Sequence, residues 1–454
     1  MALGVVLAAG ASLPATAQPL PALYQSAATI DPALAGAEAL VRAAEERVIQ
    51  AKAAFGPTVG VNGNRTGTRY YEAPTFQMRP FNATQVALQV SQPLLRLALP
   101  QQLAQAEAQL AQAQAQLRQA QTESMQRLVE SCFDVLKARD ALALLDAQSS
   151  ATGEQLSAAQ RSFKIGTAPI TDVREAEAKA DSVAAERDAA AYELDLRQQM
   201  LAEVVGHRVD GLMERGLDGQ RLPPLAATSV LEWIASGLAE NPQLRQAIEA
   251  QAAAQAEIDK AFSGHAPTVD LTFNYQLSKE TGSTTSVFPR RADSTAVGVN
   301  VNIPLFASGG THAKVREAVA QSDKAQSDVD AARRSVTLGV RQGFSATLSS
   351  ASQARGLEAA VKSAETSLRA NRRGYEVGMR INAEVLDAQT RVYESRRDLS
   401  RARYDAWVQF VKLKAVAGRL APNDLDELDG LLVAQPVSAL LQPSVPGRSK
   451  GEAR

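Results

Sequence analysis

Apolar and polar residues alternate along two stretches in the second half of the chain. From 268 to 277 and from 295 to 303, mostly valine, leucine and aromatic residues occupy every second position, and mostly Asp, Asn, Thr, Gln or Gly lie between them. This period of two predicts two strands, each with one apolar and one polar face. A weaker form of the pattern predicts strands at 58–71 and 84–92. Polar segments rich in Gly, Pro and Thr separate the strands of each pair, which predicts two hairpins.

A different pattern begins after Pro93 and again after Pro304. Segments rich in alanine, glutamine and serine predict long helices at 100–163, 170–205, 312–375 and 382–417. Leucines in the first helix keep a seven-residue spacing and then take one step of eleven, which is typical of a coiled coil with a stutter. A helix of that length spans roughly 95 Å at ~1.5 Å per residue.

Landmarks of the first half recur in the second half after a nearly constant offset. The sequence Pro-Thr-Val at 57–59 returns 210 residues later, and Gly166 is matched by Gly378, 212 residues later. An offset that changes so little along the chain predicts a tandem duplication, with structural repeats at 31–206 and 241–418. We interpret 207–240 as a side segment and 419–454 as a C-terminal tail that is partly disordered.

Composition narrows the class of protein. The net charge is −1, with 48 Lys and Arg against 49 Asp and Glu, which gives no reason to expect a nucleic acid partner. Cys132 is the single cysteine and the three histidines are far apart in sequence, so we expect no disulfide and no metal site. The chain has no nucleophile motif or phosphate loop, so we expect neither an enzyme nor a cofactor. Residues 1–17 combine an apolar run with a small-residue site before Gln18, which predicts a signal peptide lacking the usual positive n-region.

The alternating strands have the dimensions of membrane strands. About nine residues match the ~9–11 that cross a bilayer at a tilt, and an apolar outside with a polar inside is the pattern of a membrane barrel. Four strands cannot close a barrel, and an open edge is not tolerated in lipid, so several chains must share one. Two chains would give eight strands and a filled interior, whereas three would give twelve and leave a lumen. The alternative is a soluble sheet covered by the helices.

Two turn motifs carry a resemblance to a known family. FKIGTAPITDV at 163–173 and YEVGMRINAEVLDA at 375–388, with the repeated strands and helices, resemble the outer membrane factors of Gram-negative bacteria, typified by TolC. The resemblance covers nearly the whole chain after residue 17. It implies a mainly α fold with a membrane β-barrel, in which four strands per chain complete a trimeric 12-stranded barrel joined to a long α-helical coiled-coil tunnel. It also implies a location in the cell outer membrane, with the helical tunnel in the periplasm.

The same resemblance implies partners and a function. It implies a homotrimer in outer membrane lipid that works with a periplasmic adaptor (membrane fusion) protein and an inner-membrane ABC transporter or other pump. Such a trimer is the exit duct of a tripartite export system. With no lipid-anchor cysteine near Gln18, the chain is more similar to the type I secretion branch, and the outer membrane component of adenylate cyclase toxin (cyclolysin) secretion is one relative that this suggests. Multidrug efflux is the alternative function, and a periplasmic coiled-coil scaffold is the alternative of another class.

The resemblance also assigns roles within the two turn motifs. Gly166 and Gly378 mark the turns at the helical tips. The family's closed-state lock falls on Thr171, Asp172, Tyr375 and Arg380.

The family's pore constriction, which selects cations, falls on Glu384 and Asp387. Glu384 stands where the family has an aspartate, which keeps the charge on a longer side chain. The alternative interpretation is that Asp172 and Glu384 are only acids favoured by the dipoles of helix N-termini.

Overall fold

The structure is a computed structural model of the chain, and it describes residues 18–72, 77–209, 212, 215–217, 221–225, 229–286 and 288–434. The chain divides into two compact units. The strand unit contains residues 37–117 and 243–332, and the tip unit contains the remainder. The predicted signal peptide at 1–17 and the end of the predicted tail, from 435, lie outside the described residues.

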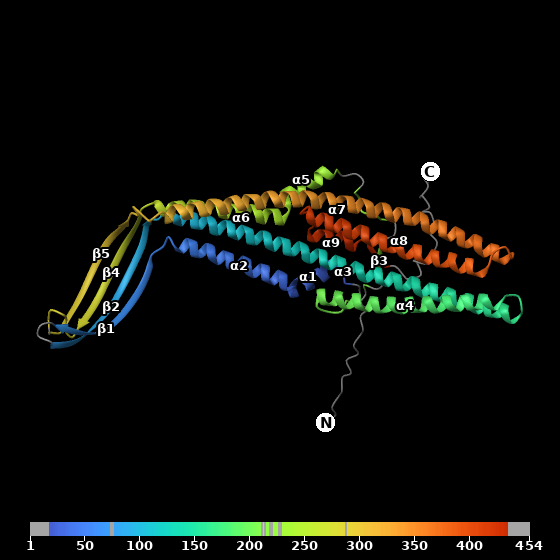
Figure 1. The fold of residues 1–454 in the computed structure, drawn as a ribbon, viewed down its shortest axis with the longest axis horizontal. Helices are drawn as coiled ribbons and strands as arrows, with labels where there is room; N and C mark the ends of the chain where they lie inside the picture. Colours follow the sequence, from blue (N-terminus) through green and yellow to red (C-terminus); the bar gives the residue numbers. More distant parts are fainter. Residues whose placement is uncertain are drawn as a thin grey trace, which may run out of the picture. The chain divides into compact units, whose positions relative to one another are not determined.

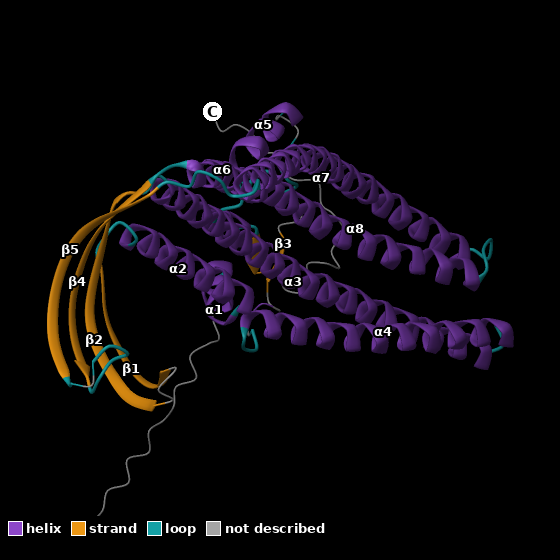
Figure 2. Cartoon of the chain, turned by 60° about the vertical axis from the view of Figure 1, so that its left-hand side comes forward, coloured by secondary structure: helices purple, strands orange, loops and turns teal. Residues whose placement is uncertain are grey.

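Four antiparallel strands form the curved sheet of the strand unit (Figure 1, Figure 2). The strands are β1 (Thr58–Glu72), β2 (Gln77–Leu95), β4 (Thr268–Glu280) and β5 (Arg290–Asn302). Their spatial order is β1-β2-β4-β5, so the two halves of the duplication meet between β2 and β4. β1 and β5 are the edge strands of this sheet.

Three of the strands are longer than the sequence predicted, whereas β1 agrees with the predicted 58–71 within one residue. β2 has 19 residues, and β4 and β5 have 13 each, so the expected length of about nine is wrong. The reason is that apolar alternation marks only part of each strand. Pairing continues beyond it through polar partners, such as Lys279 opposite Arg291.

The register gives the sheet one apolar and one polar face, because directly opposite residues point to the same side. Two consecutive rows on the apolar face are Val59, Val90, Phe273 and Val297, then Val61, Leu88, Tyr275 and Thr295. Two rows on the polar face are Gly60, Gln89, Asn274 and Ala296, then Asn62, Ala87, Gln276 and Ser294. Val59 is 66% exposed and Val297 is 70% exposed, so the helices do not cover the apolar face as a soluble sheet would require.

Four helices lead into one end of the sheet through short links. They are α2 (Pro32–Ala53), α3 (Ala98–Lys164), α6 (Pro242–Phe262) and α7 (Gly310–Glu376). The β1–β2 and β4–β5 connections therefore lie at the opposite end of the sheet. At the helical end, Arg96 donates to both carboxylate oxygens of Asp270, at 3.0 and 2.8 Å. His265 and His312, which are distant in sequence, come together there with ring centroids 4.6 Å apart.

The long helices repeat the duplication, and α3 and α7 each belong partly to the strand unit and partly to the tip unit. α3 and α7 each have 67 residues, while α4 (Ile170–Val205) has 36 and α8 (Asn382–Val416) has 35. Aromatic side chains fill part of the core of the tip unit, with the Phe133 and Tyr404 rings 5.7 Å apart. No helix that the structure describes combines the length and the hydropathy needed to cross a bilayer.

Smaller elements complete the tip unit. They are α1 (Leu20–Ile30), β3 (Arg215–Leu217), α5 (Val230–Glu240), α9 (Pro422–Asp429) and β6 (Leu432–Ala434). β3 belongs to the predicted side segment and pairs with β6, at the start of the predicted tail. Leu20 at the start of α1 donates its backbone N–H to Asp429 at 2.9 Å. The first part of the tail is therefore an ordered part of the unit.

Candidate functional site

The same turn closes both long helical hairpins. Gly166 follows α3 with φ 78°, and Gly378 follows α7 with φ 72°. The N–H of Gly166 donates to the Phe163 carbonyl at 3.0 Å, and that of Gly378 donates to the Tyr375 carbonyl at 3.0 Å. The residue after each glycine also donates to the carbonyl five positions before it, at 2.9 Å in the first turn and 2.8 Å in the second. Both turns are therefore helix C-caps with a left-handed residue.

Replacing Gly378 by alanine is expected to lower the free energy of unfolding by about 1–2 kcal/mol, because a side chain disfavours the left-handed backbone conformation. Space is not the reason, since a Cβ at Gly378 would meet no atom within 4 Å. Gly356, in the interior of α7, has equally open surroundings but a helical backbone. Gly356→Ala is therefore expected to stabilise the folded protein by about 0.5–1 kcal/mol. Thermal unfolding of the two purified variants measures whether each substitution lowers or raises the stability of the protein. Stabilisation by both substitutions would contradict the left-handed turn.

Arg380 and Glu384 form an ion pair at the second tip, one turn apart. Their side chains are 54% and 38% exposed. The stem of Arg380 lies against Gly374, where a Cβ would come within 2.7 Å of the Arg380 Cγ. The sequence assigned Arg380 to the lock and Glu384 to the constriction, and the structure brings these two residues together.

No hydrogen bond or ion pair joins the other predicted lock residues to this pair within the described part of the chain. Thr171 is exposed and Asp172 is half-buried in the first turn of α4, and Tyr375 is 38% exposed at the end of α7. Within the described part of a single chain, no hydrogen bond or ion pair joins Thr171 or Asp172 to the second tip. A lock that uses all four side chains remains a prediction about the assembled tips.

A small apolar cluster positions the acids of the tip. Ala159 of α3, Val173 and Ala176 of α4 and Leu386 of α8 are buried together. Val173 follows Asp172 directly, and Leu386 precedes Asp387, so the cluster fixes the backbone beside both acids. Asp387 is exposed, one turn from the partly exposed Glu384 on α8.

The sequence analysis missed a buried polar layer just inside the tips. Gln155 Nε2 donates to Gln389 Oε1 at 2.6 Å, and Arg372 donates to the same oxygen at 3.3 Å. Gln389 is only 1% exposed. Its spacing, four residues after Val385 and three before Val392, places it on the buried seam and was the available signal.

The remaining candidates for chemistry are clusters of metal ligands and the Cys132 thiol. Among the described residues, no group of three or more His, Cys, Asp or Glu side chains could hold a metal ion. Burial raises the pKa of the Cys132 thiol to about 12, so the reactive thiolate is scarce at neutral pH.

Comparison with known proteins identifies the family. The family model described as outer membrane efflux protein matches residues 23–207 and 233–419, two segments that begin 210 residues apart, in agreement with the duplication. Outer membrane protein TolC of Vibrio cholerae is 31% identical over 92% of this chain and 95% of its own length. Alkaline protease secretion protein AprF of Pseudomonas aeruginosa is 30% identical over 66% of this chain and 62% of its own length. Protein CyaE of Bordetella pertussis is 27% identical over 43% of this chain and 41% of its own length.

A solved structure has the same fold. The CmeC outer membrane channel of Campylobacter jejuni matches with a TM-score of 0.75 at 14% identity, over 90% of this chain and 89% of that one. The predicted location in the outer membrane is confirmed by the names of these relatives. Because the family model covers most of both repeats and TolC of Vibrio cholerae aligns along nearly the whole chain, this protein belongs to the outer membrane efflux protein family.

Proposed function

We propose that three copies of this chain form the exit duct of a tripartite export system that serves type I protein secretion. The observation that carries the proposal is a four-stranded sheet with one exposed apolar face and two edges, β1 and β5. In lipid an open edge would leave backbone N–H and C=O groups unpaired. β1 of one copy would therefore pair with β5 of the next, and three copies would close twelve strands around a lumen. The polar face, with Asn, Gln and Ser side chains, would line that lumen.

Protein cargo is supported by a relative whose name describes alkaline protease secretion. In this role the channel would receive an unfolded protein, such as a toxin of the cyclolysin type, from an inner-membrane ABC transporter. A periplasmic adaptor would join the transporter to the helical tips. Multidrug efflux is the second candidate and is supported by the description of the family. The alternative of a periplasmic scaffold no longer stands, because the family is one of outer membrane proteins.

Complementation distinguishes the two kinds of cargo. The chain is expressed in a strain without other channels of this family, together with a type I transporter, its adaptor and their protein substrate. We expect the substrate in the medium. In a parallel strain that carries a proton-driven drug pump, we expect no gain in drug resistance. Restored resistance with the protein substrate retained in the cell would instead assign the channel to efflux.

Replacing Arg380 by alanine is expected to raise single-channel conductance and cation selectivity together. Arg380 pairs with Glu384, so its loss leaves two net negative charges rather than one among Arg380, Glu384 and Asp387. Because both partners are substantially exposed, the pair is worth less than about 1 kcal/mol per chain, which a docking partner can outweigh. Planar bilayer recordings measure both quantities.

Two further variants sharpen this test of the gate. Arg380→Lys keeps the charge and should remain close to the wild type in conductance and selectivity. Tyr375→Phe combined with Arg380→Ala shows whether the Tyr375 hydroxyl adds to the lock. Unchanged conductance and selectivity in Arg380→Ala would contradict a gate at this position.

A further inference from the structure

Three basic side chains lie in one row across the sheet, near the ends of β4 and β5 that are farthest from the helices and in the middle of β1. Arg65 is opposite Thr84, Thr84 is opposite Lys279, and Lys279 is opposite Arg291. Opposite residues share a face, so the row lies on one side of the sheet. With strands ~4.8 Å apart, the row is roughly 14 Å wide.

This cationic row, Arg65–Lys279–Arg291, lies on the apolar face of the sheet. Arg65 follows Val61 by four positions on β1, and Lys279 follows Leu277 by two on β4, so each points to the same side as its apolar neighbour. All three basic residues are exposed. Within the described residues, none of the three forms an ion pair with a carboxylate. Their charges are therefore available to an anion outside the chain.

Arg291, at the β5 end of the cationic row, is at the depth of a lipid headgroup. Val301, near the helical end of β5, and Arg291 are ten residues apart, which corresponds to ~34 Å along the strand. At a tilt of ~45° this becomes ~24 Å, close to the ~25 Å height of the apolar band on membrane barrels. On β4 the row marks a boundary, because Lys279 follows the apolar Leu277 directly on this face, whereas on β5 Thr295 and Asp293 lie between Val297 and Arg291. Because the helical tunnel lies in the periplasm, this boundary belongs to the outer leaflet.

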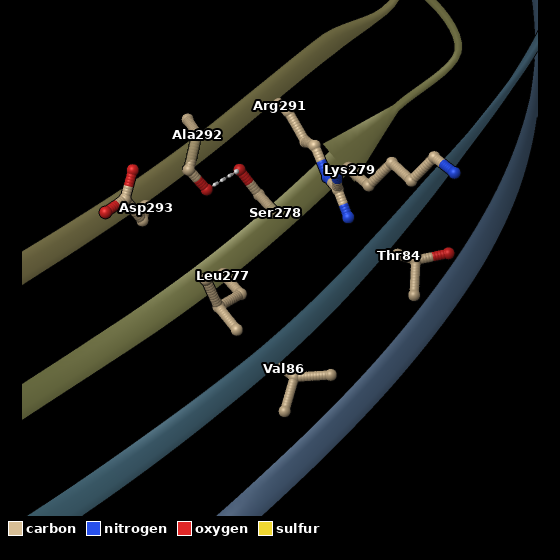
Figure 3. Close-up of a pocket in the computed structure, with 8 residues that line it drawn as sticks. All are labelled: Thr84, Val86, Leu277, Ser278, Lys279, Arg291, Ala292 and Asp293. Carbon is tan, nitrogen blue, oxygen red and sulfur yellow. Dashed lines mark hydrogen bonds between the residues drawn. The ribbon is translucent and has the colours of Figure 1, made fainter.

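An open hollow of about 330 Å³ lies beside the row on β2, β4 and β5 (Figure 3). Val86 and Leu277 give it an apolar part, and Lys279 and Arg291 give it a cationic part. Asp293 also lines it, one row nearer the helices than Arg291. The hollow therefore presents an apolar surface and positive charge next to each other, in the order in which a lipid presents its acyl chains and its phosphate.

We propose that the cationic row binds phosphate groups of the glycolipid in the outer leaflet, with the acyl chains of that lipid against Val86 and Leu277. A lipid is favoured over a free anion because the cations project from the face that contacts lipid, not from the polar face. Basic groups beside a membrane surface attract anionic headgroups, each with about a fivefold gain in affinity. The three cations of each chain act on one lipid neighbour, so a trimer holds three such sites.

Native mass spectrometry of the purified trimer with added lipid A tests the proposal. We expect diphosphorylated lipid A to bind at least tenfold more tightly than its dephosphorylated form. The variant Arg65→Gln/Lys279→Gln/Arg291→Gln is expected to lose this preference. Arg290→Gln is the matched control, because Arg290 is adjacent in sequence but lies on the polar face, opposite Glu280. It is expected to keep the full preference.

The lysine–arginine exchange variant Arg65→Lys/Lys279→Arg/Arg291→Lys retains the charges and is expected to bind like the wild type. Should the triple glutamine variant fail to assemble, Lys279→Gln and Arg291→Gln are measured singly. Each is expected to reduce the preference for diphosphorylated lipid A severalfold. Equal binding of the two forms of lipid A by the wild type, or an undiminished preference in the glutamine variants, would overturn the proposal. Binding of inorganic phosphate as tightly as diphosphorylated lipid A would also overturn it, since the site would then bind a free anion.

Discussion

Replacing Asp140 by alanine is expected to lower the free energy of unfolding by about 3–5 kcal/mol, because it removes the carboxylate that pairs with a buried guanidinium. Arg139 and Asp140 of α3 form an ion pair, and both side chains are only 4% exposed. Ser400 and Tyr404 of α8 donate to the same Asp140 carboxylate oxygen, at 2.8 and 3.2 Å. Removal of the carboxylate would take one acceptor away from the Arg139 guanidinium and from each of the two hydroxyls.

The network around Asp140 joins several elements of the tip unit. Arg139 also donates to the backbone carbonyl of Arg215 on β3, and Arg215 pairs with Asp429 of α9 at 2.7 Å. Burial, with the nearby Asp140 carboxylate, raises the pKa of the Tyr404 hydroxyl. That hydroxyl therefore stays protonated and keeps donating through the physiological pH range.

Asp146 supplies a matched control for Asp140. It is an aspartate on the same helix that pairs with an arginine, Arg187, at 2.6 Å, but both side chains are nearly half exposed. Asp146→Ala is therefore expected to shift unfolding only slightly. Denaturant unfolding of the two purified variants at one protein concentration compares them. Equal losses of unfolding free energy in the two variants would show that the buried network does not stabilise the unit.

The long helices and their tips were largely predictable from the sequence. Each tip depends on a local signal, a glycine that ends one helix and an acid within the first turn of the next, and the duplication supplied that signal twice. The length of the helices followed from periodicity sustained without a proline or a glycine cluster. Helix boundaries at Lys164 and Ile170 agree with the predicted ones within one residue.

Features that depend on distant partners were not predictable. The adjacent pair Arg139-Asp140 looks like two solvated charges in the sequence, and only the packing of α8 and β3 buries it. β3 and β6 have three residues each and exist because they pair across more than two hundred positions. The strand ends beyond the apolar alternation carry charges, which single-sequence patterns do not associate with a sheet.

Replacing Glu384 and Asp387 together by alanine is expected to abolish the cation preference of the channel. The two acids are three residues apart on α8, and Asp387 is exposed. Three copies would bring six of these carboxylates to the tip, and rings of acidic side chains select cations. The ratio of cation to anion permeability, expected to be severalfold above one in the wild type, should therefore fall to roughly one in the double variant. Block by multivalent cations added at the tip side should be lost as well.

Glu394→Ala is the control for this pair, because Glu394 is an exposed acid on the same helix, ten residues beyond Glu384. It removes a charge from α8 without touching the first turn. We expect its selectivity and block to match the wild type. A loss of selectivity in Glu394→Ala would assign the effect to the overall charge of the tunnel and not to the tip.

The reversal potential across a planar bilayer with a KCl gradient tests most directly whether the tip is the aperture of a pore. The wild type should show a reversal potential on the cation-selective side, and Glu384→Ala/Asp387→Ala should bring it close to zero with the trimer intact. Glu394→Ala should leave it unchanged. A double variant that kept the wild-type reversal potential would contradict the account, because the two acids would then serve only the N-terminus of α8.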